Sequence, residues 1–408
     1  MDDAAARQLH DHPRTERTPW GLLLLLMALT SIGPTTLNIV VPALPNLANR
    51  LASDVGTIQL IISVYLLALA AGQLLMGPLS DRFGRRPVLL VALTITALAS
   101  ISAVLISTVQ SLILARVLQA VGASAGLVVS RAIIRDLFDR NRAASMLGLV
   151  ATVMVVVPTL APLTGGLLET GFGWESIFIF TAFTSTLVVI WAAFTLPETR
   201  GLNVAHGAQE GFFRDLVKLC RNPRFAGYVL AGAFGSATFF AFLGGGAHVV
   251  VTLMRASPAE YGVWWAISSL GYMTGNFLSS RLSTRHGIDR LIWAGIAIEI
   301  AGVALSTVLA VYALHWGPVI VFLPQLIVNL GNGLLLPGAI AGAVSIRPQA
   351  AGTAAGITGF IQMALGAAVA QYAGTLMADS PSAVPLSLLM VLLAAVLAIS
   401  FAMLVRRS

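Results

Sequence analysis

The feature that most constrains this chain is a series of apolar runs, each about 20 residues long. The plainest of them cover residues 19–43, 87–107 and 384–404. A helix rises about 1.5 Å per residue, so a run of this length matches the hydrocarbon thickness of a bilayer. Hydrophobic residues make up 57% of the chain and charged residues 10%, whereas a soluble domain has about 45–50% and about 25%. We therefore predict an all-α polytopic membrane protein rather than a soluble protein with buried helices.

The apolar runs recur along the whole sequence and are separated by short polar segments. Each run predicts one membrane-spanning helix. The twelve predicted spans are 19–43, 57–79, 87–107, 110–134, 143–168, 174–196, 225–252, 260–281, 289–312, 316–344, 350–377 and 384–404.

Basic residues fall mainly on one side of these spans. With the N-terminus in the cytoplasm, 21 of the 24 Lys and Arg residues lie on or near the cytoplasmic side. Arg50 and Arg255 lie outside, and Arg116 lies within a span. This distribution follows the positive-inside rule, so we expect a multi-pass protein of the cell inner membrane with both termini in the cytoplasm. The net charge of +7 therefore reflects orientation in a lipid bilayer and does not indicate a nucleic-acid partner.

The longest polar interruption, residues 197–224, divides the spans into two groups of six. The turn after the second span reads GPLSDRFGRR, and the turn after the eighth reads GNFLSSRLSTRHG. Independent drift could produce similar turns, but two related halves suit a transporter in which each half moves as a body around a central site. The predicted segments are a cytoplasmic tail at 1–18, an N-terminal half at 19–196, a central cytoplasmic loop at 197–224 and a C-terminal half at 225–408.

The turn at residues 77–90, GPLSDRFGRRPVLL, concentrates charge in an otherwise apolar region. Gly77 would allow close helix approach. Asp81 at a helix end can accept hydrogen bonds from Arg85, and Asp136 at the end of the fourth span should reach the same region. We expect a latch that is intact in one conformation and broken in the other, because each charge-assisted contact contributes about 1.5–3 kcal/mol. A solvated cluster that anchors the topology is the alternative.

This turn resembles the loop signature of the major facilitator superfamily. The matching residues, which form the expected gate together with Asp136, are Gly77, Asp81, Arg82, Gly84, Arg85 and Arg86. Three further stretches resemble motifs of the family in its fourth, fifth and first spans: ARVLQAVGASAG, PTLAPLTGGLL and VPALPNLA. With RAIIRDLF, they narrow the resemblance to the bicyclomycin/chloramphenicol-resistance (Bcr/CflA) branch of multidrug efflux proteins. The resemblance implies the major facilitator fold, with twelve transmembrane helices in two six-helix halves.

Two features inside the spans are unusual for a lipid environment. Arg116 lies near the start of the fourth span, where an Arg costs about 2.5–3.5 kcal/mol unless it finds a partner or water. The resemblance implies that Arg116 faces a central cavity, and pairing with a backbone carbonyl is the alternative. The fifth span contains Pro158, Pro162, Gly165 and Gly166, which can bend a helix and allow tight packing. In antiporters of the family this stretch is regarded as a hinge that seals the interface between the halves; ordinary packing glycines are the alternative.

The proton-coupling residue expected from the resemblance is missing. First spans of this branch commonly carry an Asp four residues before the first Pro of PALP, and this chain has Asn38, whose amide does not titrate. Glu299, the one obvious carboxylate in the middle of a span, and His248 are therefore proton-coupling candidates. A neutral accessory Glu in a peripheral ninth span and a structural His are the alternatives.

Polar residues in the first, second and fourth spans are candidates for a substrate cavity, because the resemblance places these spans around it. They are Asn38, Gln59, Tyr65, Gln73, Arg116 and Gln119. Gln59 is the weakest candidate, since it lies near the outer end of its span. Apolar walls with a few polar groups suit amphipathic small molecules.

Together these features predict secondary active efflux of hydrophobic or amphipathic small molecules, such as drugs and antibiotics, by alternating access and in exchange for protons. A metabolite exporter of the same fold and a transport-inactive membrane sensor or scaffold are the alternatives. The sequence has no HExxH, no Walker loop and no nucleophile constellation in its spans, so we expect no enzyme activity, no cofactor and no metal. The expected partners are the substrate, protons and the bilayer, with the chain acting as a monomer.

Overall fold

The computed structural model describes residues 20–105, 108–138, 140–199, 217–312, 316–347 and 350–405. The predicted tail at 1–18 and residues 200–216 of the predicted central loop lie outside these ranges. The described residues form helices joined by short turns, and no strand occurs among them. The predicted all-α fold is confirmed.

The first group of helices precedes the predicted central loop. Its members are α2 (Trp20–Asn38), the 3₁₀ turn η1 (Val41–Ala43), α3 (Leu44–Arg50), α4 (Val55–Phe83), α5 (Arg85–Val104), α6 (Val109–Leu137), α7 (Arg140–Phe172) and α8 (Glu175–Thr195). α2, η1 and α3 together form one membrane-spanning segment. The bend at η1 coincides with Pro42, which cannot donate a backbone hydrogen bond.

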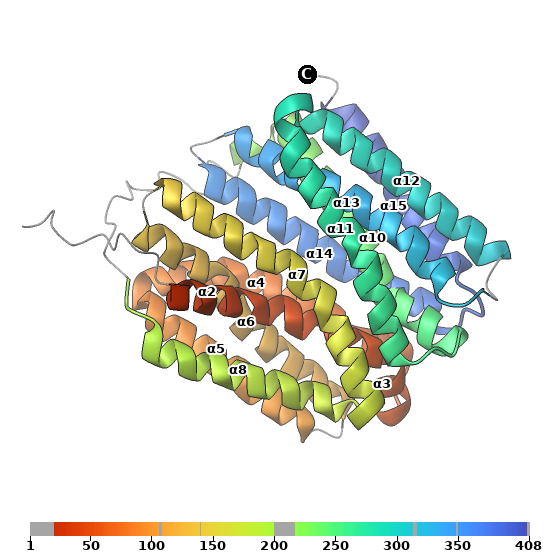
Figure 1. Ribbon diagram of the computed structural model, residues 1–408, viewed down its shortest axis with the longest axis horizontal. Coiled ribbons are helices and arrows are strands. Elements are labelled where there is room, and N and C mark those ends of the chain that lie inside the picture. Colours follow the sequence, from red (N-terminus) through yellow and green to blue (C-terminus); the bar gives the residue numbers. More distant parts are fainter. Residues whose placement is uncertain are drawn as a thin grey trace, which may run out of the picture.

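The second group follows the predicted central loop. Its members are α10 (Pro223–Ala247), the π-helical turn η2 (His248–Leu253), α11 (Pro258–His286), α12 (Ile288–Tyr312), α13 (Val319–Ser345), α14 (Ala351–Ala378) and α15 (Val384–Val405). Figure 1 shows the first group, coloured red to lime, lying beside the second group, coloured green to blue.

Within the described residues, eleven helical segments have the length and hydropathy of membrane spans. α11, 29 residues long, is the twelfth long helix and is less apolar because serines, glycines and tyrosines interrupt its apolar residues. It packs against α7, α12 and α13, so much of its surface faces protein rather than lipid. The twelve predicted spans thus correspond to twelve helices in two groups of six.

The short turns make consecutive helices antiparallel, so alternate turns lie on the same side of the bundle. We call the side that holds Trp20 and Val405 the terminal face, and the other side the opposite face. Two turns of the terminal face share a backbone conformation: Gly84 between α4 and α5 has φ 103°, and Gly287 between α11 and α12 has φ 78°. Residues that carry a side chain rarely adopt a positive φ, which explains why both similar turn sequences contain glycine at this position.

The two groups pack against each other through two pairs of long helices. α7 packs against α11, and α4 packs against α14. These four helices therefore form the main contact between the two groups.

Candidate functional site

A cavity of about 270 Å³ lies between the two groups of helices. Helices α2, α4, α6 and α7 of the first group and α10, α11, α13 and α14 of the second form its wall. The lining residues are Pro34, Leu37, Asn38, Leu69, Leu127, Met154, Pro158, Thr159, Ser236, Phe239, Phe240, Trp265, Ser269, Tyr272, Asn329, Asn332, Leu336, Gln362 and Met363. None of these side chains carries a charge at neutral pH.

Aromatic rings form one wall of the cavity. The ring centroids of Phe239 and Trp265 lie 5.6 Å apart, and those of Phe239 and Phe240 lie 5.4 Å apart. Both pairs meet edge to face, which aromatic rings prefer. The wall is therefore a fixed apolar surface that suits a flat or aromatic molecule.

Pro162 in α7 explains why Trp265 is held in place. Pro162 has no N–H to donate to the carbonyl of Pro158 four residues earlier, so that carbonyl lacks its helical hydrogen bond. Trp265 Nε1 donates to the Pro158 carbonyl oxygen at 3.1 Å. A side chain of the second half thereby satisfies a backbone group of the first half.

α7 and α11 are tightly packed toward the opposite face. A methyl group on Gly166 would lie 2.1 Å from the Pro258 carbonyl oxygen, and one on Gly262 would lie 2.6 Å from the Pro162 carbonyl oxygen. Such distances exclude any side chain. A methyl group on Gly165 would lie 1.9 Å from the carbonyl oxygen of Ile39 within the first half. The glycines of the predicted hinge thus lie where backbones meet.

α4 and α14 close the same face through Gln371. The Ser63 hydroxyl donates to Gln371 Oε1 at 2.6 Å, and Gln371 Nε2 donates to the Gly56 carbonyl oxygen at 2.8 Å. Gln59 is buried beside them, and its side chain would touch a methyl group on Gly374. The expectation that Gln59 faces water or the cavity is therefore wrong in this conformation, since Gln59 lies in the contact between the halves.

Several glycines near the terminal face have open space beside them. A methyl group on Gly148 in α7, or on Gly352 or Gly356 in α14, would have no neighbour within 4 Å. A methyl group on Gly77 would meet only Val128 Cγ1, at 3.8 Å. The close backbone approach expected at Gly77 is absent in this conformation, since only one side-chain carbon of α6 lies near it.

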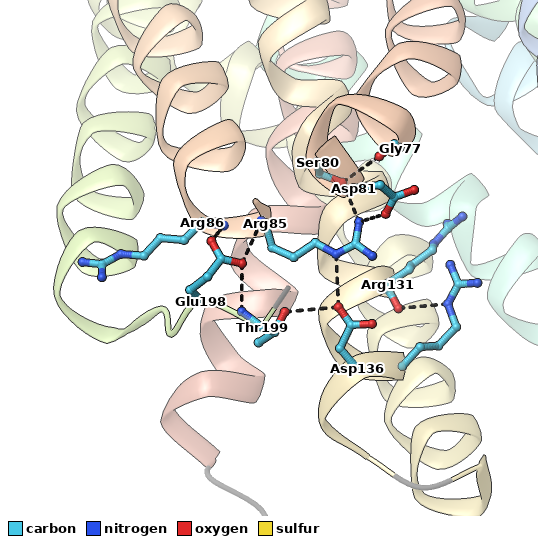
Figure 2. Close-up of polar contacts among 10 residues, drawn as sticks. Gly77, Ser80, Asp81, Arg85, Arg86, Arg131, Asp136, Glu198 and Thr199 are labelled. Atoms are coloured by element: carbon cyan, nitrogen blue, oxygen red, sulfur yellow. Dashed lines mark hydrogen bonds and ion pairs between the residues drawn. The ribbon is translucent and has the colours of Figure 1, made fainter. Parts of the chain in front are cut away.

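The charged turn at the terminal face forms a compact cluster around Arg85. Arg85 Nε donates to Asp136 Oδ2 at 3.1 Å, Arg85 Nη1 donates to Ser80 Oγ at 2.7 Å, and Arg85 also pairs with Asp81. Figure 2 shows the Arg85 guanidinium between the two carboxylates. The structure thus brings together residues from α4, α5 and α6, all within the first half.

Glu198, after α8, is a member of this cluster that sequence reasoning missed. Its carboxylate accepts the backbone N–H groups of Arg85 and Arg86 at 3.0 and 3.2 Å, at the start of α5 (Figure 2). The neighbouring Thr199 hydroxyl donates to Asp136 Oδ2 at 3.2 Å. A carboxylate at a helix N-terminus is stabilised by the unpaired N–H groups there. The terminal end of the first half is therefore tied together by four segments of chain.

The outer members of the charged turn make fewer contacts. Arg86 Nη2 donates to the Ala193 carbonyl oxygen at 2.7 Å. The Arg82 guanidinium lies 5.3 Å from the centroid of the Phe83 ring, and both side chains are exposed.

Arg116 is buried within the first half rather than lining the cavity. It donates to the Thr36 carbonyl oxygen at 2.8 Å, the Ile61 carbonyl oxygen at 3.2 Å and Gln119 Oε1 at 3.0 Å. Its guanidinium lies 4.2 Å from the centroid of the Tyr65 ring. The cavity-lining role expected of Tyr65, Arg116 and Gln119 is wrong in this conformation, because these side chains join α2, α4, α5 and α6 to one another.

Of the predicted cavity residues, Asn38 alone lines the cavity, and Gln73 is half-buried outside it. His248 is half-buried at the start of η2, also outside the cavity lining. Asn38 Nδ2 donates to the Pro34 carbonyl oxygen at 2.8 Å, and Asn38 Oδ1 is buried without a hydrogen-bond partner among the described residues.

Glu299 is fully buried directly behind the cavity wall. Its Oε1 lies 2.8 Å from Thr238 Oγ1, and the Thr238 hydroxyl also contacts the Gly235 carbonyl oxygen at 2.8 Å. Asn332, which lines the cavity, donates to Thr238 Oγ1 at 3.3 Å. Glu299 thus contacts the cavity wall through one hydroxyl and one amide.

Glu169 is a second buried carboxylate that sequence reasoning missed, because it lies near the end of α7 beside the glycine pair. Asn46 Nδ2 donates to Glu169 Oε1 at 2.7 Å, at the edge of a polar hollow of about 340 Å³ on the opposite face. The next residue, Thr170, accepts the backbone N–H of Ala259 across the halves at 3.1 Å. Among the described residues, no group of three or more His, Cys, Asp or Glu could hold a metal ion.

Comparison with known proteins identifies the family to which the sequence is similar. Residues 23–371 match the Major Facilitator Superfamily. The chain is 30% identical over 345 residues to the Multidrug resistance protein D of Escherichia coli, with 84% of this chain and 85% of that protein covered. It is 32% identical over 331 residues to a Chloramphenicol resistance protein of Pseudomonas aeruginosa, with 81% and 76% covered. It is 24% identical over 366 residues to a Bicyclomycin resistance protein homolog of Haemophilus influenzae, with 90% and 92% covered.

Solved structures share the fold. The crystal structure of a D-xylose-proton symporter superposes with a TM-score of 0.76 at 14% identity, covering 93% of this chain and 97% of that chain. At this identity the likeness concerns the fold alone.

Proposed function

This chain belongs to the Major Facilitator Superfamily, with relatives of the Bcr/CflA type, and we propose that it exports small hydrophobic or amphipathic molecules by alternating access. The observation that carries this proposal is the uncharged, partly aromatic cavity between two halves that pack tightly at the opposite face and leave open space beside glycines near the terminal face. An apolar wall with a few polar groups favours amphipathic molecules. Relatives named for resistance to chloramphenicol and bicyclomycin support antibiotics as the exported class.

We place the terminal face, and with it both chain termini, in the cytoplasm of a cell whose inner membrane holds the protein. Among the described basic residues, Arg50 and Arg255 lie at the opposite face, whereas the other basic residues outside the spans lie at or near the terminal face. Cytoplasmic loops are enriched in Lys and Arg, which supports this orientation. In it, the conformation described above is open toward the cytoplasm and closed toward the outside.

The two predicted halves, 19–196 and 225–408, are the proposed moving bodies. Opening toward the outside requires the α7–α11 and α4–α14 contacts to break and the terminal ends of these helices to approach. Space near Gly77 and Gly356 allows that approach. The hinge residues Pro158, Pro162, Gly165 and Gly166 lie in the contact that must break, which supports a role in sealing it.

The charged cluster is the proposed cytoplasmic latch. Its contacts at Gly84, Arg85 and Asp136 hold the ends of α4, α5 and α6 together in the inward-open conformation. Because Arg82 is exposed and Arg86 contacts α8, we assign the latch function mainly to Asp81, Arg85 and Asp136.

Export in exchange for protons is the proposed energy source, with Glu299 as the carrier. Thr238 has one hydroxyl hydrogen, yet its oxygen contacts two acceptors, the Gly235 carbonyl and Glu299 Oε1. Both contacts are hydrogen bonds when Glu299 is protonated and donates to Thr238. A protonated Glu299 also avoids a buried unpaired charge, since no ion pair to it occurs among the described residues. His248 lies outside the cavity lining and lacks such a connection to the cavity.

Transport by purified protein in proteoliposomes tests the proposed function. Chloramphenicol uptake should depend on an imposed pH gradient and should be accompanied by proton movement in the opposite direction. The Gly166→Ala variant, which cannot restore the α7–α11 contact, should lose coupled transport, whereas Gly148→Ala should retain it. Unsaturable chloramphenicol uptake that is independent of the pH gradient and equal in the two variants would contradict the proposal and favour a protein without transport activity.

A further inference from the structure

Resting on the proposed export function, we infer that Arg131 forms an anion-binding subsite between the cavity and the terminal face, where it holds the carboxylate of an amphipathic organic acid. The apolar part of such a molecule lies in the uncharged cavity. Three features of Arg131 support this inference: its position beside the cavity, its lack of an acidic partner among the described residues, and its charge within a membrane span.

Arg131 lies next to the cavity on α6. Leu127, which lines the cavity, precedes Arg131 by four residues, so the two side chains lie on the same face of the helix. Arg131 Nη2 donates to Met154 Sδ of α7 at 3.4 Å, and Met154 also lines the cavity. Because α6 runs toward the terminal face and ends there at Leu137, the guanidinium lies at the terminal edge of the cavity.

The Arg131 guanidinium has no acidic partner among the described residues. Its side chain donates there only to Met154 Sδ, which is a weak acceptor without charge. The nearby carboxylates of Asp81 and Asp136 both pair with Arg85. In Figure 2 the Arg131 guanidinium lies apart from the pair formed by Arg85 and Asp136. A guanidinium has five N–H donors, so most of those on Arg131 remain available to a ligand.

An arginine inside a membrane span needs a partner, water or a lipid headgroup. Arg131 lies within the apolar span Val109–Leu137, and its side chain is exposed. Ionisable residues in such spans usually face the interior of the bundle or a water-filled path, and they mark the routes that substrates take. The contact with Met154 places the guanidinium on the cavity side of α6. We therefore assign Arg131 to the route of the substrate.

Arg135, one turn further along α6, adds a second positive charge toward the terminal face. Arg135 Nε donates to the Arg131 carbonyl oxygen at 3.2 Å. Two positive charges one turn apart produce a local positive potential, which raises the concentration of organic anions at this end of the cavity. The two arginines thus attract an acid from the terminal face toward the subsite.

A carboxylate matches the Arg131 guanidinium in charge and in shape. The planar guanidinium can donate two parallel hydrogen bonds to the two oxygens of one carboxylate, which an amide or an ester cannot accept in the same way. An apolar body attached to that carboxylate would lie against Leu127 and Met154 in the cavity. The exported class would therefore include molecules with an aromatic or aliphatic body and one carboxylate.

Binding of 1-naphthylacetate and 1-naphthylacetamide to the purified full-length protein tests the inference. The two probes have the same rings and nearly the same size, but only the acid is charged at neutral pH. We expect the acid to bind about tenfold or more tightly than the amide, as one additional charge-assisted contact implies. Raising the salt concentration should weaken binding of the acid and leave binding of the amide unchanged, because salt screens exposed charges.

Variants assign the effect to Arg131. Arg131→Gln should weaken binding of the acid to the level of the amide, whereas Arg131→Lys should keep part of the preference because it keeps the charge. Arg281→Gln is the matched control, since the Arg281 guanidinium lies 5.2 Å from the ring centroid of the exposed Phe277 on its own helix. Thermal unfolding identifies any variant that fails to fold, and the wild-type comparison of the two probes does not depend on the variants.

The outcomes separate the inference from the function on which it rests. Failure of the acid to bind, equal wild-type affinity for acid and amide, or an unchanged preference in Arg131→Gln would overturn the inference, while chloramphenicol transport would still support export. Loss of bound phosphatidylglycerol in Arg131→Gln with unchanged binding of the acid would identify a lipid headgroup as the partner and would also overturn it. Absence of binding and transport for chloramphenicol and for both probes would overturn the inference and the proposed function together.

Discussion

Buried residues with polar groups serve different purposes in this protein, depending on which helix face they occupy. Arg116 joins three helices within the first half. Trp265 reaches across to the first half, where Pro162 has left the Pro158 carbonyl without its helical partner. Asn38 lines the cavity, and its side-chain oxygen is buried without a hydrogen-bond partner among the described residues. Substitutions at these positions are therefore expected to have different effects.

We predict that Trp265→Phe weakens the contact between the halves at the opposite face. Phenylalanine keeps an aromatic ring but cannot donate to the Pro158 oxygen, and an unsatisfied buried acceptor costs about 1–3 kcal/mol. The outward-open population should therefore rise, measured by spin-label distances between the opposite-face ends of α7 and α11. The exposed Cys220 is first replaced by Ser so that labels attach only at the chosen sites. Trp264→Phe is the matched control, since Trp264 stacks on Phe322 and does not contact Pro158; an equal shift in both variants would refute the assignment.

We predict that Arg116→Met lowers stability without acting on ligand selectivity. Methionine fills similar volume but leaves the Thr36 and Ile61 carbonyl oxygens without their donor, at a net cost of about 1–3 kcal/mol. The melting temperature in detergent should fall, while the relative affinities of different drugs stay constant. Arg82→Met, at an exposed site, should leave the melting temperature unchanged. Altered drug preference at unchanged stability would instead place Arg116 in the binding site.

At the scale of helices, one set of contacts holds helices together at each face of the bundle. The Arg85 cluster ties α4, α5 and α6 at the terminal face. The glycine contacts of α7 with α11 and the Gln371 contacts of α14 with α4 hold the halves together at the opposite face. Alternating access requires the contacts at the opposite face to open. The latch proposal requires the Arg85 cluster to change at the same time.

We predict that Asp136→Asn raises the outward-open population more than Asp81→Asn does. The Arg85 and Asp136 side chains are 14% and 11% exposed, whereas Asp81 is 64% exposed. A largely buried charge-assisted pair contributes about 1.5–3 kcal/mol, but a solvated pair contributes about 0–1 kcal/mol. Removing a contact disfavours the conformation that contains it, so the larger loss produces the larger shift, about tenfold against less than about fivefold.

Spin-label distances between the terminal ends of α4 and α14 measure this shift. Arg82→Ala is the control, because Arg82 contacts only Phe83 of its own turn among the contacts of the described residues. If Asp136→Asn folds normally and leaves the population unchanged, the cluster is a static tie within the first half and not a latch.

We predict that a single methyl group at Gly166 disrupts closure of the opposite face. The added carbon would lie 2.1 Å from the backbone oxygen of Pro258, so α7 and α11 must separate. Overpacking of this kind costs about 1–3 kcal/mol, which shifts the conformational equilibrium about tenfold or more toward the outward-open form. Labelling of an engineered cysteine beneath the contact, from the outside of intact cells, reports this opening. Gly148→Ala on the same helix has no neighbour within 4 Å and should behave as wild type; similar labelling in both variants would contradict the role of the contact.

At the scale of the whole molecule, the sequence was sufficient for the spans, the two groups of six and the charged turn, because hydropathy and helix-end signals are local. The cavity wall was predicted poorly. Tyr65, Arg116 and Gln119 were expected there, but a polar side chain inside a bundle can bond to carbonyl or hydroxyl groups of neighbouring helices, and sequence spacing does not tell which face meets the other half. Glu198 was missed because it is 113 residues from Arg85 in the chain. Contacts of that length depend on how the helices are arranged, which no local pattern encodes.

Coupling between proton movement and drug movement provides the last prediction, since the proposed exchange requires the two to be tied together. Glu299→Gln keeps the size of the side chain and can still bond to Thr238, so the fold and the cavity should be preserved. An amide cannot carry a proton, so the variant should lose drug-driven proton movement while still exchanging drug for drug across the membrane. Thr238→Val, which interrupts the contact between Glu299 and Asn332, should slow proton movement in the same assay. His248→Ala should leave it unchanged, since His248 lies outside the cavity lining. Normal proton movement in Glu299→Gln would remove Glu299 as the carrier and direct attention to Glu169, the other carboxylate buried among the described residues, which adjoins the contact between the halves through Thr170.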